Sequence, residues 1–109
     1  MARWSVETLN DTVDREIGAL PADMRARFVR ISELIAAVGL ERVREPYVKH
    51  LQGPLWEMRM TGRDGTSRAV YVTVRDRRVI VVRVFIKKTR KTPRSEVRLA
   101  LQRAREVLQ

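Results

Sequence analysis

The feature that most constrains the fold is an apolar run near the end of the chain, from Arg78 to Ile86. Its residues are apolar on both faces of an extended chain, which is typical of a central strand covered on both sides. The run leads directly into the cations Lys87-Lys-Thr-Arg-Lys91, and these lead into a segment with helical periodicity. A cation cluster between a buried strand and a helix is held in place, so the sequence predicts a fixed positive site suited to phosphate groups.

Charge is divided unevenly along the 109 residues. Residues 1–45 carry seven Lys or Arg and eight Asp or Glu, whereas residues 46–109 carry 16 and five, and the whole chain has a net charge of +10. The excess of basic residues in the second half therefore predicts a surface that binds an anionic partner such as nucleic acid. A well-solvated, Arg-rich surface is the alternative interpretation of the same pattern.

The composition excludes several classes of protein. The absence of cysteine rules out disulfides, thiol nucleophiles and cysteine-ligated zinc, and a single histidine leaves no usual set of metal ligands. An apolar fraction of 44% in periodic segments indicates one folded domain over residues 1–109. The beginning of the chain lacks an apolar signal core, and no apolar run approaches a membrane span. We therefore expect a soluble, cytoplasmic protein without a cofactor.

The periodicity predicts the element order β-α-α-β-β-β-α. Strands are expected over residues 3–8, 55–60, 67–74 and 78–86, because their apolar residues alternate or run continuously. Helices are expected after Asn10, after Pro21 and after Thr92-Pro93, where capping residues precede apolar stripes at helical spacing. The last stripe extends to Leu108, and residues 41–54 are expected to be irregular because Pro46, Gly53 and Pro54 interrupt them. The predicted fold class is α+β: a small, mostly antiparallel, twisted sheet with two N-terminal helices packed on it and a C-terminal helix.

The side chains best support chemistry on a phosphate of RNA. RNA supplies its own nucleophile, the 2′-hydroxyl, so a nuclease need only align the attack, stabilise charge and move protons. Arg59 and Arg68 lie on neighbouring predicted strands and are candidates for stabilising charge, although ordinary solvent-facing positions would have the same spacing. Arginine does not readily exchange protons at neutral pH. The candidates for proton transfer are Glu45, Lys49, His50, Glu57, Tyr71, Lys87 and Lys88.

Three stretches resemble the RelE/HigB toxin superfamily. Lys49-His-Leu-Gln-Gly-Pro-Leu-Trp-Glu-Met-Arg59 resembles its L-x-G-x-L-W-E-x-R stretch, and Arg68-Ala-Val-Tyr71 resembles its Y-R-x-x-Y strand. Residues 85–97, followed by Ala100 and Arg103, are similar to the ending of the HigB-like, phage-derived branch. The three stretches occur in register on the same element order, which makes the resemblance more specific than any one of them.

The resemblance implies the toxin of a type II toxin–antitoxin system. Such toxins are endoribonucleases that typically cut mRNA in the ribosomal A site, without a metal, by attack of the 2′-hydroxyl. A cognate antitoxin, commonly a helix-turn-helix protein in this branch, holds them inactive. By position, the resemblance implies catalytic roles for Arg59, for Arg68 at the scissile phosphate and for Lys88 near the end of the last strand, and we add Glu57 as a candidate acid or base. We expect RNA contacts from Lys49, His50, Tyr71, Lys87, Arg90, Lys91 and Arg94.

The chain also departs from the pattern of the family. Glu57 stands where RelE-type members have a lysine, and Glu96 and Val97 occupy the region of the family's catalytic tyrosine. The general acid and base therefore stay open, with Glu45 and His50 as competitors of Glu57. Two other functions stay open as well: a non-catalytic RNA- or ribosome-binding protein, and a degenerate toxin that retains only antitoxin binding.

Overall fold

The apolar run near the end of the chain forms β5 (Arg78–Lys87), an inner strand of a five-stranded sheet. The computed structural model describes residues 3–108. The strand order is β1-β5-β4-β3-β2, with β1 at Ser5–Thr8, β2 at Val48–Gln52, β3 at Leu55–Gly62 and β4 at Gly65–Val74. β1 pairs with β5 in parallel, and the other neighbours are antiparallel. The prediction of a mostly antiparallel sheet is confirmed.

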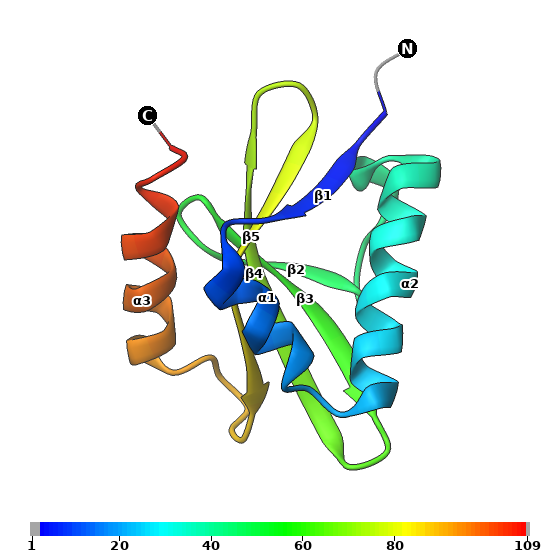
Figure 1. Cartoon of the computed structure of the whole chain (residues 1–109), viewed down its shortest axis with the longest axis vertical. Coiled ribbons are helices and arrows are strands. Elements are labelled where there is room, and N and C mark those ends of the chain that lie inside the picture. The colour runs from blue at the N-terminus through cyan, green and yellow to red at the C-terminus, as the bar shows by residue number, and fades with distance from the viewer. Residues whose placement is uncertain (1–2, 109) are drawn as a thin grey trace.

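Helices cover both faces of the sheet. α1 (Asp11–Gly18) and α2 (Ala22–Val38) pack on one face and α3 (Arg94–Ala104) packs on the other, so the sheet lies between two helical layers (Figure 1). The predicted cap of α1 is present, because the Asn10 side chain accepts a hydrogen bond of 3.1 Å from the Val13 amide. α2 ends before Gly39, whose φ of +91° is unfavourable for other residues. These observations confirm the predicted α+β class.

The core consists of two apolar clusters, one on each face of the sheet. The cluster under α1 and α2 includes Ile31, Ile35, Met58 and Met60, all at most 1% exposed. The residues of the cluster under α3 include Leu55, Val70, Val72, Ile80, Val82 and Ala100. Because β5 contributes to both clusters, its apolar pattern on both faces is explained by its place between the two layers.

Two expectations about single elements were wrong. Residues 41–54 are not irregular throughout, because a 3-10 helix η1 (Leu40–Arg42) overlaps their beginning and β2 lies within them. The helix predicted to extend to Leu108 ends at Ala104, and the side chain of Leu108 is 40% exposed. The strand ends differ from the predicted ends by one or two residues, since β4 begins at Gly65 and β5 ends at Lys87.

A network of ion pairs ties α1, β5 and α3 together. The Arg83 guanidinium donates to Glu96 at 2.6 and 3.1 Å and to Glu16 at 2.8 Å. Arg103 on α3 also donates to Glu16, at 3.1 Å, and Glu16 accepts a hydrogen bond of 3.0 Å from the Val84 amide. This amide lies beyond Val81, the last residue of β5 that pairs with β1. Glu16 therefore accepts a hydrogen bond from a backbone amide that has no partner strand. No helix among the described residues is long and apolar enough to cross a membrane.

Candidate nucleic-acid interface

A β-bulge in β5 decides which face of the sheet carries Lys87. Val70 on β4 pairs with Arg83, whereas the next residue, Tyr71, pairs with Val81, so Val82 is the extra residue on β5. Lys87 follows Phe85 by two residues, and Phe85 belongs to the cluster on the α3 face. Since alternate residues of a strand share a face, the bulge places Lys87 on the α3 face as well.

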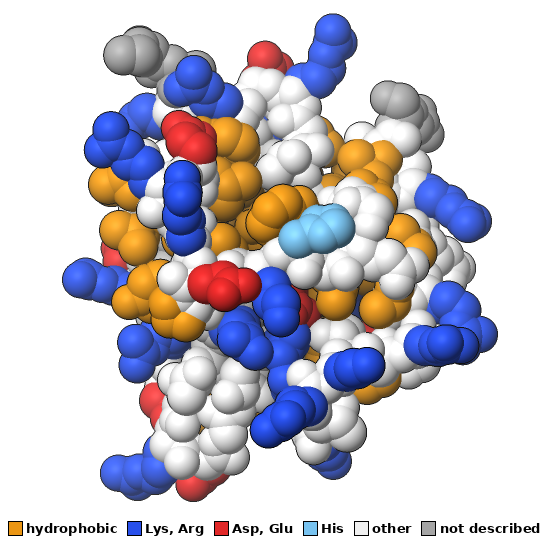
Figure 2. Space-filling model, turned by 180° about the vertical axis from the view of Figure 1, so that it is seen from behind, with side chains coloured by type: hydrophobic (Ala, Val, Ile, Leu, Met, Phe, Trp, Pro, Cys, Tyr) orange, Lys and Arg blue, Asp and Glu red, His pale blue; other side chains and the backbone are white. Residues whose placement is uncertain are grey.

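Basic residues from three strands meet on this face. Arg59 on β3 pairs with Arg68 on β4, and Thr66 on β4 pairs with Lys87 on β5. The side chains border a hollow of about 450 Å³, which we call the cationic hollow. Its lining residues are Pro46, Arg59, Thr61, Thr66, Arg68, Lys87, Lys88, Thr89 and Arg90. None of the described residues that line it is acidic, and Figure 2 shows Lys and Arg side chains gathered on this side of the molecule.

Arg68 and Glu57 form a buried ion pair at the base of the cationic hollow. Their side chains are 4% and 1% exposed, and Arg68 Nη1 donates to Glu57 Oε1. The segment that follows β5 closes over the pair: Thr92 Oγ1 donates to Glu57 Oε2 at 2.9 Å, and Arg68 Nη2 donates to the Arg90 carbonyl at 3.4 Å. The interpretation of Arg68 as a solvent-facing strand residue was therefore wrong. The Glu57 carboxylate does not line the hollow, so it is poorly placed to accept a proton from RNA.

The electrostatics single out Lys87. Burial lowers its pKa from the usual 10.5, and the charges of Arg68, Arg59, Lys49 and Arg90 lower it further. Burial also lowers the pKa of Arg68. A lysine with a lowered pKa exchanges protons closer to neutral pH, which is the property required for acid–base work. Its neighbour Lys88 also lines the hollow, but its side chain is exposed.

The other predicted RNA contacts are distributed around this centre. Lys49 pairs with Glu57 across β2 and β3 and is close enough to affect Lys87 electrostatically. Lys91 and Arg94 are exposed and lie outside the set of residues that line the hollow. All five cations that line the hollow were among the predicted site residues, whereas Lys91 and Arg94 were predicted to contact RNA and do not line it.

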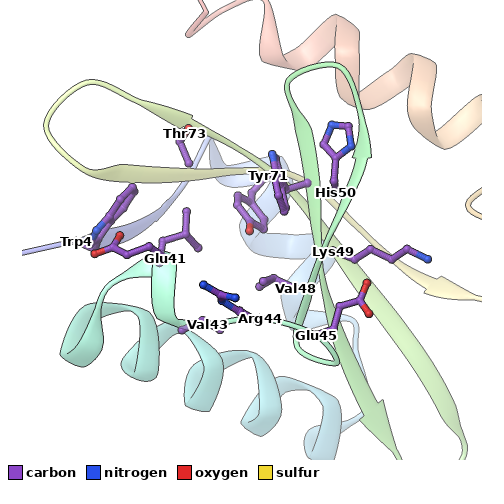
Figure 3. Close-up of a pocket in the computed structure, with 12 residues that line it drawn as sticks. Trp4, Glu41, Val43, Arg44, Glu45, Val48, Lys49, His50, Tyr71 and Thr73 are labelled. Atoms are coloured by element: carbon purple, nitrogen blue, oxygen red, sulfur yellow. The ribbon is translucent and has the colours of Figure 1, made fainter.

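His50 and Tyr71 belong to a second hollow. This aromatic hollow of about 630 Å³ lies on the α2 side of the sheet (Figure 3). The residues that line it are Trp4, Leu40, Glu41, Val43, Arg44, Glu45, Val48, Lys49, His50, Trp56, Tyr71 and Thr73. Tyr71 is 1% exposed, and burial raises its pKa. Because Tyr71 packs in the core, the expectation that it contacts RNA from the surface is not supported.

Sequence reasoning missed the roles of Thr92 and of the threonines on the strands. Thr92 was expected only to open α3, yet its hydroxyl contacts both partners of the buried pair. Thr61 and Thr66 add hydroxyl groups to the wall of the cationic hollow. The alternation along β3 and β4 contained a signal, since it places Thr61 and Thr66 on the face of Arg59 and Arg68. Among residues 3–108, no group of three His, Asp or Glu residues is arranged to hold a metal ion.

Comparisons with known proteins bear out the resemblance seen in the sequence. The family model described as phage derived protein Gp49-like (DUF891) matches residues 15–105. RelE in the archaeal RelE–RelB complex from Pyrococcus horikoshii OT3 is similar in structure, with a TM-score of 0.60 and 19% identity over 81% of this chain and 98% of that chain. A double arginine mutant of the E. coli toxin RelE in the free state has a TM-score of 0.61 and 17% identity, over 99% and 100% of the two chains. No curated protein sequence matches the chain.

Proposed function

Because the chain belongs to the phage-derived Gp49-like family and has a RelE-like fold, we propose that it is the toxin of a type II toxin–antitoxin system and cleaves mRNA. The observation that carries the proposal is the cationic hollow, where five basic side chains from β3, β4, β5 and the following segment surround a space without a carboxylate among its described lining. Such a space attracts a phosphodiester and stabilises the charge that develops during its cleavage.

The proposed reaction needs the RNA, the side chains of the hollow and water as the acceptor of one proton. The 2′-oxygen forms a bond to the adjacent phosphorus, the bond to the 5′-oxygen breaks, and a 2′,3′-cyclic phosphate and a 5′-hydroxyl result. Arg59 and Lys87 bind the phosphate oxygens, and Lys87 donates a proton to the leaving 5′-oxygen. The proton of the 2′-hydroxyl passes to water, since the Glu57 carboxylate is withheld by Arg68. Lys88 and Arg90 contact neighbouring phosphates at the rim.

We assign Arg68 and Glu57 a positioning role in this reaction. The guanidinium of Arg68 is committed to Glu57, Thr92 and the Arg90 carbonyl, so it cannot also grip a phosphate with the same hydrogens. Its contacts hold the segment from Lys88 to Thr92 over the end of β5. In this way the pair fixes the cations of that segment around the hollow.

The experiment that tests the function is controlled expression in a bacterial host, followed by primer extension on an abundant transcript. We expect growth arrest and new cuts within translated codons for the wild type, and loss of both for Arg59→Ala and Lys87→Ala. Arg98→Ala, at an exposed position on α3, is the matched control and should remain toxic. Arrest without cuts would instead support the second candidate, a protein that blocks ribosomes by binding alone. That candidate is favoured by the withheld Glu57 carboxylate.

We also propose that a cognate antitoxin neutralises the chain. The RelE of Pyrococcus horikoshii was crystallised as a complex with RelB, which supports a protein partner for a chain of the same fold. The net charge of +10 favours a partner with an acidic segment. Co-expression of an adjacent helix-turn-helix gene should restore growth and yield a complex that elutes together from a sizing column. Continued arrest despite a stable neighbouring protein would argue against that partner.

A further inference from the structure

The aromatic hollow has the chemistry of a nucleobase site. Its volume of about 630 Å³ lies within the range of roughly 300–1,000 Å³ typical of small-molecule sites, which are mainly apolar with a few polar groups. Trp4 and Trp56 line it and are at least partly exposed, the buried Tyr71 lies beneath it, and His50 lies at one end (Figure 3). Nucleobases stack on such rings whatever their sequence, because every base has a π-face.

Trp56 is partly exposed and is held in place by a neighbouring ring, which favours stacking of a base on it. Its side chain is 40% exposed, although it is one of the largest apolar side chains of the protein. The His50 ring packs edge-on against the indole, with ring centroids 5.0 Å apart, and His50 Nε2 lies 2.9 Å from the Gly53 carbonyl. The indole is therefore held from one side while part of its surface stays open, which lowers the entropy lost when a ligand stacks on it.

The two hollows adjoin along one short segment. Glu45, Val48 and Lys49 line the aromatic hollow, and Pro46 between them lines the cationic hollow. The Lys49 side chain extends away from the aromatic hollow (Figure 3), and its charge acts on Lys87. Lys49 thus lies between the two spaces, where it can contact the backbone of a strand that passes from one to the other. Figure 2 shows an apolar patch beside the histidine and the basic cluster on the same side of the molecule.

The polar groups of the aromatic hollow match the edge of a base. The Arg44 side chain donates hydrogen bonds and suits a carbonyl oxygen or a ring nitrogen, and the Glu41 carboxylate accepts them and suits an amino group, whereas the Glu45 carboxylate is directed away from Trp4 and Tyr71 (Figure 3). Within the described chain, the Trp4 indole N–H is buried without an acceptor, and Trp4 lines the same hollow.

From these contacts we infer that the aromatic hollow binds a base of the same RNA strand whose phosphate occupies the cationic hollow. The inference rests on the proposed RNA substrate and adds a second point of contact to it. Trp56 and Arg59 are three residues apart on β3 and therefore point to opposite faces of the sheet. The RNA strand would pass from one hollow to the other around the sheet edge, where residues of the segment 45–49 line both hollows. A partner protein that inserts an apolar side chain into the hollow is the competing occupant.

Binding of short 2′-O-methyl RNA, which cannot be cleaved, tests the inference. Affinities would be measured for the wild type, Trp56→Ala, Trp56→Phe and Tyr47→Ala, against an adenine oligomer and an otherwise identical abasic oligomer. Removing a stacking ring costs about 1–3 kcal/mol, so Trp56→Ala should weaken adenine binding roughly 5- to 150-fold. Trp56→Phe should recover most of the loss. Tyr47, an aromatic residue that is 41% exposed and lines neither hollow, is the matched control and should bind like the wild type.

The outcomes separate this inference from the proposed function. Equal weakening of adenine and abasic binding in Trp56→Ala would overturn the base site, because the loss would not depend on a base. Wild-type affinity of Trp56→Ala for adenine, with loss in Arg59→Ala, would overturn the base site and keep the RNA substrate. Loss of antitoxin binding alone in Trp56→Ala would assign the hollow to a protein partner. Absence of RNA binding by the wild type would overturn both proposals.

Discussion

Lys87 is the residue to which the proposed function assigns the proton transfer. If it protonates the leaving oxygen, Lys87→Ala should lower the single-turnover cleavage rate about 10²- to 10⁴-fold. Only the protonated lysine is active, so the wild-type rate should fall as pH rises through a pKa that lies below the usual 10.5. Lys87→Arg should retain RNA affinity and lose the proton step, since arginine stays charged. A wild-type rate in Lys87→Arg would contradict the acid role.

Lys88 provides an internal comparison for that prediction. It is the next residue along the chain, lines the same hollow and is exposed. The resemblance implies a catalytic role for Lys88, whereas burial and neighbouring charge lower the pKa of Lys87. We now expect Lys88→Ala to weaken RNA binding and to leave the shape of the pH–rate profile unchanged.

The buried pair of Glu57 and Arg68 should matter first for stability. Glu57→Ala would leave a buried guanidinium without its partner, which should cost about 3–5 kcal/mol in the free energy of unfolding. The double variant Glu57→Leu/Arg68→Met should be less destabilised than the sum of the single variants. Urea unfolding of the wild type, Glu57→Leu, Arg68→Met and the double variant measures the coupling energy. Additive losses would show that the two side chains do not depend on each other.

At the residue scale, the sequence predicted which types of side chain meet but not their exposure. The sequence placed Arg59 and Arg68 on neighbouring strands, and the register of β3 against β4 pairs them and so brings both to one face. Strand alternation alone would have placed Lys87 on the opposite face, since it is an even number of residues from Val79 in the α2-side cluster. The bulge at Val82 reverses that parity. Bulges depend on how two strands pair, so a single strand sequence does not reveal them.

At the scale of elements, Glu16 connects helices that lie on opposite faces of the sheet. It accepts hydrogen bonds from Arg83, Arg103 and the Val84 amide, and its side chain is 14% exposed. Hydrogen bonds to charged groups contribute about 1.5–3 kcal/mol, so Glu16→Ala should lower the free energy of unfolding by about that amount. The urea midpoint measures this loss. Glu33→Ala, at an exposed position of α2, should shift the midpoint little.

The hairpin between β3 and β4 depends on a contact with the start of α2. Asp23 Oδ2 accepts a hydrogen bond of 2.6 Å from the Arg63 amide, and this bond is the main cause of the lowered pKa of Asp23. A lowered carboxyl pKa stabilises the fold above the unfolded pKa, and the stabilisation is lost as pH falls through the folded pKa.

Asp23→Asn should therefore lower the urea midpoint at pH 7 and have a smaller effect at about pH 3, below the ordinary aspartate pKa of about 3.9. Hydrogen exchange of the Arg63 amide should also become faster in the variant. Asp64→Asn, in the exposed tip of the same hairpin, is the control and should change neither quantity. A midpoint shift that is equal at both pH values would assign the effect of Asp23 to something other than its charge.

The element that sequence analysis missed, β2, was missed for a physical reason. Only Val48 of its five residues is buried, because β2 is an edge strand with one neighbour. Its alternation is therefore weak, and the turn residues on either side give the stronger signal. The long inner strands and the helices were predictable because each buries a continuous stripe. β2 nevertheless separates the two hollows, so the missed element is also the one that relates them.

At the scale of the whole molecule, the two halves of the sequence that differ in charge build different parts of the structure. The nearly neutral first half supplies β1, α1 and α2, which build one helical layer. The second half supplies the inner strands and the segment after β5, and thereby the lining of the cationic hollow. The excess of basic residues is therefore concentrated where a polyanion would bind, which connects the charge pattern to a measurable property.

That property is the dependence of RNA affinity on salt. Each phosphate neutralised on a single strand releases counterions and contributes a slope of about −0.7 to log K against log salt concentration. If Arg59 binds a phosphate, Arg59→Ala should lower affinity and make the slope shallower by about 0.7. Arg98→Ala, which removes the same charge from the exposed side of α3, should leave the slope nearly unchanged. An equal change in both variants would mean that RNA responds to the net charge of +10 and not to the cationic hollow.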